Sequence, residues 1–239
     1  MPGKPVASRG YKAHRCPTCQ LPTAGCICHF TPTIRTPVRF WILMHPGEAQ
    51  KPTNTARLIA AALPHTRVFL WQRTTPPAEL CDLLSAPQFA PYLVFPQGNA
   101  ERFERLPADS WHLGRVPAFV ILDGTWRQTR RMFVRSPYLR GVPCLTLRPK
   151  VPSAYTLRRQ VHSDYLSTVE VAIALLAQLG TTEASDILSA YFRVFIASCQ
   201  AARQAHPLCE ALPEIQQLLQ YRRQHALSPL SPEGTGPAM

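Results

Sequence analysis

The chain has 239 residues, of which 26 are Lys or Arg and 14 are Asp or Glu, so its formal charge is +12. Its apolar stretches are too short to cross a bilayer and its first residues lack the apolar core of a signal peptide, which excludes a membrane protein and predicts a cytoplasmic one. The Arg-rich positive charge favours a polyanionic partner such as a nucleic acid, although codon usage in a GC-rich genome is an alternative source of arginine.

The elements predicted along the chain alternate between strands and helices. Residues 1–13 and 228–239 are rich in Pro, Ser and Gly and are predicted to be flexible tails. Between them lie β-like runs at 38–44, 67–71, 92–95, 118–122 and 144–147, and helical patterns near 53–64, 77–85, 125–135, 167–179, 183–203 and 210–226. The alternation predicts one α/β domain over 36–227, with a parallel sheet covered by helices on both faces.

Ahead of this domain, residues 14–35 carry Cys16, Cys19, Cys26 and Cys28 in the pattern C-x2-C-x6-C-x-C. In a reducing compartment such cysteines are metal ligands more often than disulfides, and four thiolates complete a tetrahedral structural zinc site. An iron–sulfur cluster and unliganded thiols are the alternatives. A module this short cannot bury a core of its own, so the metal would supply most of its folding energy.

The other four cysteines are isolated in apolar surroundings and are predicted to be inert core thiols. They are Cys81, Cys144, Cys199 and Cys209.

Residues 45–58, HPGEAQKPTNTARL, follow the first predicted strand and crowd polar side chains into a strand-to-helix connection. Such connections carry binding residues in α/β proteins, and the candidates here are His45, Glu48, Lys51, Asn54 and Arg57. Two simpler interpretations remain open: Asn54 or Thr53 caps the next helix, and His45 is a structural histidine.

Residues 120–132, VILDGTWRQTRRM, place Asp123 where an apolar strand ends and a basic helix begins. Ligands of open α/β sheets bind outside the carboxyl ends of the strands, so Asp123 is a site candidate; a helix N-cap is the alternative. In the helix, Arg127, Arg131 and Arg135 share one face and Trp126 and Phe133 another. The arginine face predicts phosphate contacts, with a merely solvated face as the alternative.

Residues 166–180, LSTVEVAIALLAQLG, begin with Ser167 and Glu170 in a capping-box pattern. Local structure therefore explains both residues. A helix N-terminus also binds anions, and Arg158 precedes it by a loop's length, so an anion or carboxylate site is the second interpretation.

Taken in order, five segments resemble the DTW-domain family: the cysteine cluster, HPGEAQKPTNTARL, LVFP, ILDGTW and YTLRR with LSTVEVA. The family signature corresponds to Asp123, Thr125 and Trp126. The resemblance covers about residues 16–200, and Ala56 departs from it where glycine is expected after Asn-Thr.

The resemblance implies a tRNA-uridine aminocarboxypropyltransferase that uses S-adenosylmethionine, with a fold similar to the SPOUT superfamily and a C-terminal trefoil knot. Strand and helix patterns alone do not predict that knot. The implied nucleophile is N3 of a uracil, in the variable loop of a tRNA, and the implied electrophile is the methionine Cγ, so methylthioadenosine leaves. The target uridine would have to be flipped out of the stack.

The resemblance also assigns roles to individual residues. Asp123 becomes the candidate general base, and Thr125 and Trp126 complete the catalytic pocket. The candidate cofactor contacts are Phe95, Pro96, Gly98, Leu122, Asp123, Trp126, Arg158, Ser167, Thr168 and Glu170. The candidate RNA contacts are Lys51, Asn54, Arg57, Arg127 and Arg131. A SPOUT-like RNA methyltransferase and a noncatalytic zinc-containing RNA-binding protein are the competing functions.

Overall fold

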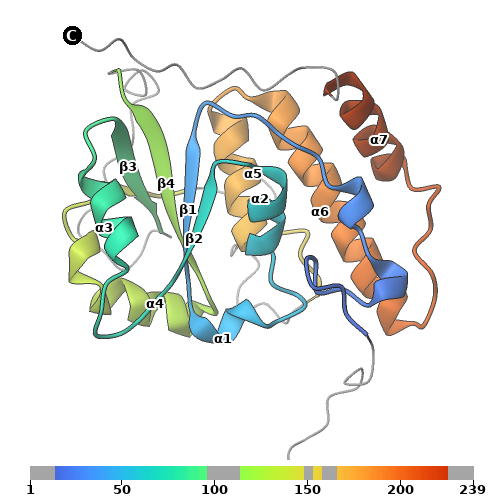
Figure 1. The fold of residues 1–239 in the computed structure, drawn as a ribbon, viewed down its shortest axis with the longest axis horizontal. Coiled ribbons are helices and arrows are strands. Elements are labelled where there is room, and N and C mark those ends of the chain that lie inside the picture. The colour runs from blue at the N-terminus through green and yellow to red at the C-terminus, as the bar shows by residue number, and fades with distance from the viewer. Residues whose placement is uncertain (1–13, 96–113, 148–152, 158–165, 226–239) are drawn as a thin grey trace, which may run out of the picture.

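A five-stranded parallel sheet forms the centre of the molecule (Figure 1). The computed structural model describes residues 14–95, 114–147, 153–157 and 166–225. Its strands are β1 (Arg39–Met44), β2 (Thr66–Leu70), β3 (Phe89–Val94), β4 (Val116–Asp123) and β5 (Cys144–Leu145), in the order β2-β1-β4-β3-β5. Every neighbouring pair is parallel, which confirms the predicted sheet.

The central strands β1 and β4 are apolar on both faces, as expected for a doubly covered sheet. Side chains alternate along β1: Phe40 and Ile42 enter one core, whereas Trp41 and Leu43 enter the other. The two cores explain why the strand reads as a continuous apolar run rather than as an alternating one.

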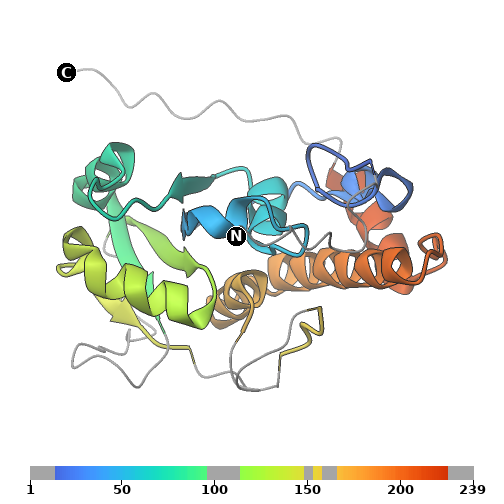
Figure 2. The ribbon, with the colours of Figure 1, turned by 90° about the horizontal axis from the view of Figure 1, so that it is seen from below.

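Helices cover both faces, as the sequence predicts (Figure 2). One face carries α3 (Ala78–Ser85) and α4 (Trp126–Arg135), and the other carries α2 (Ala56–Ala62), α5 (Thr168–Gln178) and α6 (Thr182–Arg203). The last helix described, α7 (Pro213–His225), packs on α6. The sequence did not predict α1 (Pro46–Ala49), a single turn directly after β1.

The cysteine segment, residues 14–35, packs against α6 and α7, the last two helices that the structure describes. It contains two short 3₁₀ helices, η1 (Thr23–Gly25) and η2 (Cys28–Phe30), which contact α6 and α7 respectively. Ser198 Oγ on α6 donates to Gly25 O at 2.6 Å, and a Cβ at Gly25 would lie 2.9 Å from that hydroxyl, so a larger residue there would have to displace it. The segment therefore shares the core of the main domain instead of forming a separate body.

The predicted flexible tails, at 1–13 and 228–239, fall on residues outside the described ranges. The described residues do not show the trefoil knot that the family resemblance implies. These stay predictions. Within the described ranges, no helix combines the length and hydropathy that a bilayer crossing requires.

Candidate active site

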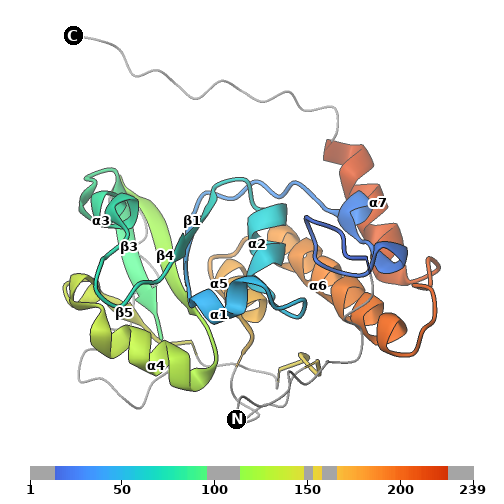
Figure 3. The same ribbon diagram turned by 60° about the horizontal axis from the view of Figure 1, so that its bottom comes forward.

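Polar side chains meet at the carboxyl ends of β1 and β4. Asp123 is the last residue of β4, pairs with Met44 across the sheet and is only 4% exposed. The backbone N–H of His45 donates to the Asp123 carbonyl at 2.8 Å, which fixes the exit of β1 beside it. Figure 3 turns this edge toward the viewer, with α1 between α4 and the cysteine segment. The predicted placement of Asp123 at a strand end is confirmed.

The Asp123 carboxylate joins three segments that are far apart in sequence. Its Oδ2 accepts a hydrogen bond from Asn54 Nδ2 at 2.6 Å, and its Oδ1 accepts one from Thr168 Oγ1, also at 2.6 Å. Hydrogen bonds donated to a carboxylate are strong and favour its ionised form. The loop before α2, the end of β4 and the first turn of α5 are thereby held around one negative charge.

Asn54 is itself buried, with 2% of its surface exposed, and its Oδ1 has no hydrogen-bond partner. The amide orientation is fixed because a flipped amide would place oxygen against the Asp123 carboxylate. Leaving a buried acceptor unpaired costs about 1–3 kcal/mol. The sequence predicted Asn54 as an RNA contact; its observed contact is with Asp123, and the RNA role stays a prediction.

Arg57 organises the loop that carries Asn54. Its guanidinium donates to the backbone carbonyls of Lys51 at 2.7 Å and Asn54 at 3.2 Å, and to that of Cys19 at 3.3 Å. One arginine therefore connects the cysteine segment to the Asp123 site. Its predicted contact with RNA stays untested beside these protein contacts.

The other predicted basic contact of this loop, Lys51, pairs with a buried acid. Its Nζ lies 2.5 Å from Glu48 Oε1, and Glu48 is 1% exposed. The ion pair neutralises a buried carboxylate, which explains a lysine at this position without RNA. An RNA contact by Lys51 stays a prediction.

His45 is the N-cap of α1. Its Nδ1 accepts from the Gly47 N–H at 3.1 Å and lies 3.1 Å from Gln128 Nε2, and the ring stacks on Trp71. Desolvation lowers the pKa of His45, and the nearby Glu48 carboxylate only partly opposes this shift. The imidazole is therefore neutral at pH 7, in agreement with an Nδ1 that accepts.

This geometry gives His45 a pH-dependent effect on stability. Because the folded-state pKa lies below the unfolded value of about 6.5, the unfolded chain binds the proton more readily. The stabilisation of the folded state by the neutral His45 ring is complete above about pH 6.5 and is lost as the pH falls through the folded-state pKa. His45→Asn keeps a good N-cap, so we expect it to flatten the fall in Tm of the wild type between pH 7.5 and 5.5. Parallel Tm curves for the two proteins would contradict this assignment.

The DTW residues Thr125 and Trp126 begin α4. Thr125 is its N-cap, and the Thr125 N–H donates to Gln128 Oε1 at 2.7 Å, completing a capping box that the T-x-x-Q pattern could have revealed. Trp126 stacks on Phe95 with ring centroids 5.6 Å apart, and Phe95 stacks on Phe133 at 4.6 Å. The predicted aromatic face of this helix is confirmed.

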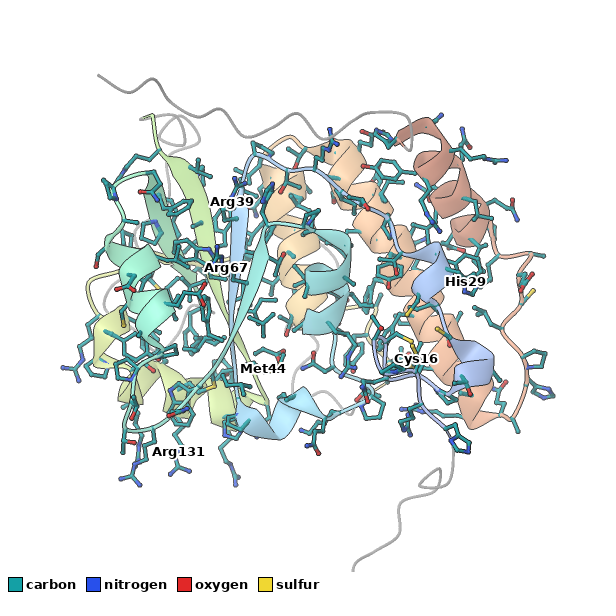
Figure 4. All side chains as sticks on the ribbon, in the orientation of Figure 1. Cys16, His29, Arg39, Met44, Arg67 and Arg131 are labelled. Atoms are coloured by element: carbon teal, nitrogen blue, oxygen red, sulfur yellow. The ribbon has the colours of Figure 1, made fainter. Side chains whose placement is uncertain are left out.

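The predicted arginine face of α4 points to solvent. Arg127, Arg131 and Arg135 are all exposed, and Figure 4 shows Arg131 projecting away from the ribbon. A row of exposed arginines next to the Asp123 site can contact phosphates.

The start of α5 is held by Glu170. Its carboxylate accepts from the Ser167 and Ala154 N–H groups, each at 2.7 Å, and from Ser153 Oγ at 2.7 Å. The capping box is confirmed, and the carboxylate also fixes the chain around 153–154. Among the predicted cofactor contacts, Phe95, Leu122, Asp123, Trp126, Ser167, Thr168 and Glu170 lie near this edge of the sheet, whereas Pro96, Gly98 and Arg158 lie outside the described residues.

The four N-terminal cysteines converge as metal ligands do. All four Sγ atoms lie within 4.8 Å of one another, with 3.6 Å between Cys16 and Cys28 and 3.8 Å between Cys19 and Cys26. A tetrahedron with zinc–sulfur bonds of about 2.3 Å has edges of about 3.8 Å. Backbone hydrogen bonds from the Cys19 and Thr18 N–H groups lower the pKa of the Cys16 thiol to about 6, whereas burial raises the pKa of the Cys19 and Cys28 thiols, so the case for a metal rests on the sulfur geometry. The donor set fits a single tetrahedral metal ion.

The remaining cysteines divide into buried and exposed ones. Burial raises the pKa of Cys144 to about 11 and that of Cys199 to about 12, as expected of inert core thiols. Cys81 is half-buried. Cys209 is exposed, so the prediction of a core thiol is wrong there. It precedes α7 in a stretch whose few apolar side chains leave it in solvent.

Comparison with known proteins identifies the family. The DTW domain model matches residues 13–200. Three curated relatives are named tRNA-uridine aminocarboxypropyltransferase 2. That of Macaca fascicularis is 27% identical over 177 residues, covering 69% of this chain and 56% of the relative. That of Mus musculus is 28% identical over 174 residues, covering 69% of this chain and 56% of the relative. That of Drosophila melanogaster is 27% identical over 175 residues, covering 70% of this chain and 67% of the relative.

The chain thus spans little more than half the length of the two mammalian relatives. No solved structure matches it. The domain model nevertheless covers most of the chain, including the cysteines, the Asn54 loop, Asp123 and the start of α5. The chain belongs to the DTW domain family.

Proposed function

We propose that this protein transfers the 3-amino-3-carboxypropyl group of S-adenosylmethionine to N3 of a uridine in the variable loop of tRNA. Family membership and the names of the relatives support the reaction class. The observation that carries the proposal is the convergence at Asp123, where Asn54 and Thr168 each donate a hydrogen bond of 2.6 Å. Three separate motifs of the family thus build one buried polar site at the place where α/β proteins bind ligands.

The reaction forms a bond between uracil N3 and the methionine Cγ and breaks the bond between Cγ and sulfur, so methylthioadenosine leaves. The N3 proton must pass to a base, and Asp123 is the carboxylate that we assign to this role. Asn54 and Thr168 hold that carboxylate in one orientation, because each occupies a different oxygen. Orientation matters in this reaction since the methyl carbon of the same sulfonium is also electrophilic and has to be turned away from N3.

The aromatic group beside Asp123 suits the adenosine part of the cosubstrate. Phe95, Leu122 and Trp126 belong to one apolar cluster where β3 and β4 end. We assign adenine to this cluster and to Pro96 and Gly98, the ribose to Ser167, Thr168 and Glu170, and the carboxylate of the amino-acid part to Arg158. The C-terminal trefoil knot that the family resemblance implies belongs to the same proposal.

We assign zinc to Cys16, Cys19, Cys26 and Cys28, in a structural role. A single tetrahedral ion explains their sulfur spacing, whereas thiolates that bind different irons of a cluster lie farther apart. Four thiolates leave no open position for a substrate. The metal would act by fixing the segment whose Cys19 carbonyl accepts from Arg57.

The exposed arginines of α4 form the proposed tRNA-binding face, and we expect Arg127→Ala combined with Arg131→Ala to weaken tRNA binding. Each lost phosphate contact lowers the slope of log Kd against log salt by about 1, so the double variant should lose about 2. Arg223→Ala, an exposed arginine on α7, is the matched control and should leave the slope unchanged. Fluorescence anisotropy with labelled tRNA over a salt series measures both. Equal slopes for all three proteins would contradict this face.

Analysis of the small-molecule product tests the reaction class. Protein incubated with S-adenosylmethionine and tRNA is expected to release methylthioadenosine in a tRNA-dependent manner. Release of S-adenosylhomocysteine would instead identify an RNA methyltransferase. Absence of both products, with folded and metal-loaded protein, would favour a noncatalytic RNA-binding protein.

A further inference from the structure

The unpaired oxygen of Asn54 lies next to the residue that we assign as the base. Asn54 is 2% exposed, its Nδ2 donates to Asp123 at 2.6 Å, and its Oδ1 has no partner. Among the described residues, the other buried side-chain polar atom without a partner is the Tyr138 hydroxyl, which lies beyond α4 and away from Asp123 in sequence. Buried amides are normally satisfied on both atoms, so an acceptor left unpaired beside a functional carboxylate indicates a ligand that donates to it.

The chemistry around Oδ1 selects a cationic donor. The Nδ2 end of the same amide donates to the Asp123 carboxylate, so a negative charge lies one hydrogen bond away from the amide that carries Oδ1. An acceptor next to negative charge favours an ammonium group over a neutral N–H. The proton on uracil N3 is a poor match, because that proton has to reach a base and a carboxamide is not one.

The cosubstrate carries such an ammonium close to its reacting carbon. In the aminocarboxypropyl chain, only Cβ separates the Cα that bears the ammonium from the Cγ that is attacked. When Asp123 lies against uracil N3, the ammonium group is therefore close enough to be contacted by residues that neighbour Asp123. Asn54 is that neighbour of Asp123, on the Oδ2 side of the carboxylate.

We propose that Asn54 Oδ1 accepts a hydrogen bond from the α-ammonium group of the aminocarboxypropyl chain. This inference rests on the proposed function and assigns Asn54 to the cosubstrate instead of to RNA. The oxygen is shielded from solvent, so the ammonium has to displace the groups that shield it. The contact would hold the chain so that Cγ, and not the methyl carbon, faces the base.

A thermodynamic cycle tests the contact without relying on catalysis. Calorimetry compares the affinity of S-adenosylhomocysteine, which does not react, with that of its analogue in which hydrogen replaces the α-ammonium. Wild-type protein should prefer the ammonium ligand by about tenfold to 100-fold, the range expected for a hydrogen bond to a charged group. Asn54→Leu removes the acceptor and should reduce this preference to within about twofold. Asn54→Ala serves the same purpose if the leucine variant does not fold.

Thr168→Val is the matched control, because it removes the other hydrogen bond of 2.6 Å to Asp123 and leaves Asn54 Oδ1 in place. It should retain the preference for the ammonium ligand. If Thr168→Val abolishes the preference as Asn54→Leu does, the effect passes through Asp123 and the inference is overturned. It is also overturned if wild-type protein binds both ligands equally while still releasing methylthioadenosine, which would leave the proposed function intact. Failure of wild-type protein to bind either ligand would overturn both.

Discussion

Asp123→Asn is expected to lower the rate of aminocarboxypropyl transfer by about 10²–10⁴-fold, the usual contribution of a general base. The substitution keeps the shape of the side chain but removes its charge and its ability to take the N3 proton. It also sets an amide NH₂ against Asn54 Nδ2 or Thr168 Oγ1, both of which donate to Asp123 in the wild type. A loss of about 1–3 kcal/mol in the free energy of unfolding should accompany the loss of rate.

Single-turnover transfer of label from S-adenosylmethionine to tRNA measures the rate, and thermal denaturation measures the stability. Asp186→Asn is the matched control, because Asp186 is an exposed acid on α6 and should change neither quantity. A near wild-type transfer rate in a folded Asp123→Asn protein would show that the carboxylate only shapes the loop. In that case Asp123→Asn would lower the free energy of unfolding without lowering the transfer rate.

Cys19→Ser is expected to abolish metal binding and to destabilise the whole domain. Structural zinc binds isolated fingers with about 10–16 kcal/mol, and in this fold its segment shares the main core. Even a loss of about 3 kcal/mol would lower the Tm of a chain of this size by about 6–12 °C. Because the Cys19 carbonyl accepts from Arg57, the backbone amides of 49–54 should also exchange faster with solvent.

Metal content by mass spectrometry, differential scanning calorimetry and hydrogen exchange measure these three effects. Cys209→Ser, the exposed cysteine, is the control and should retain about one metal ion per chain and an unchanged Tm. Chelation of the wild type should reproduce the Cys19→Ser result. Metal-free protein with an unchanged Tm and unchanged exchange at 49–54 would contradict a structural metal.

Local patterns predicted the elements well because each element satisfies its own periodicity. The apolar run before Asp123 became β4, and the S-x-x-E pattern at Ser167 became a capping box at the start of α5. The single turn α1 escaped prediction because Pro46 and Gly47 are typical of loops. The turn forms because His45 caps it and proline is tolerated at its first position.

The connections within the site could not be read from sequence for a different reason. Asn54 and Asp123 are 69 residues apart, and Asp123 and Thr168 are 45 apart, so only the strand order brings them together. Asn54 and Arg57 have the same local pattern whether they face RNA or the protein. Tertiary packing buries the first against Asp123 and directs the second to backbone carbonyls.

The central claim is tested most directly by the nucleosides of tRNA treated with this protein. The tRNA has to lack the modification, and S-adenosylmethionine is labelled either in the aminocarboxypropyl chain or in the methyl group. Mass spectrometry should find chain label, and no methyl label, on a uridine of the variable loop, and Asp123→Asn should remove it. Methyl label on the RNA, or an unchanged uridine profile with folded and metal-loaded protein, would contradict the account.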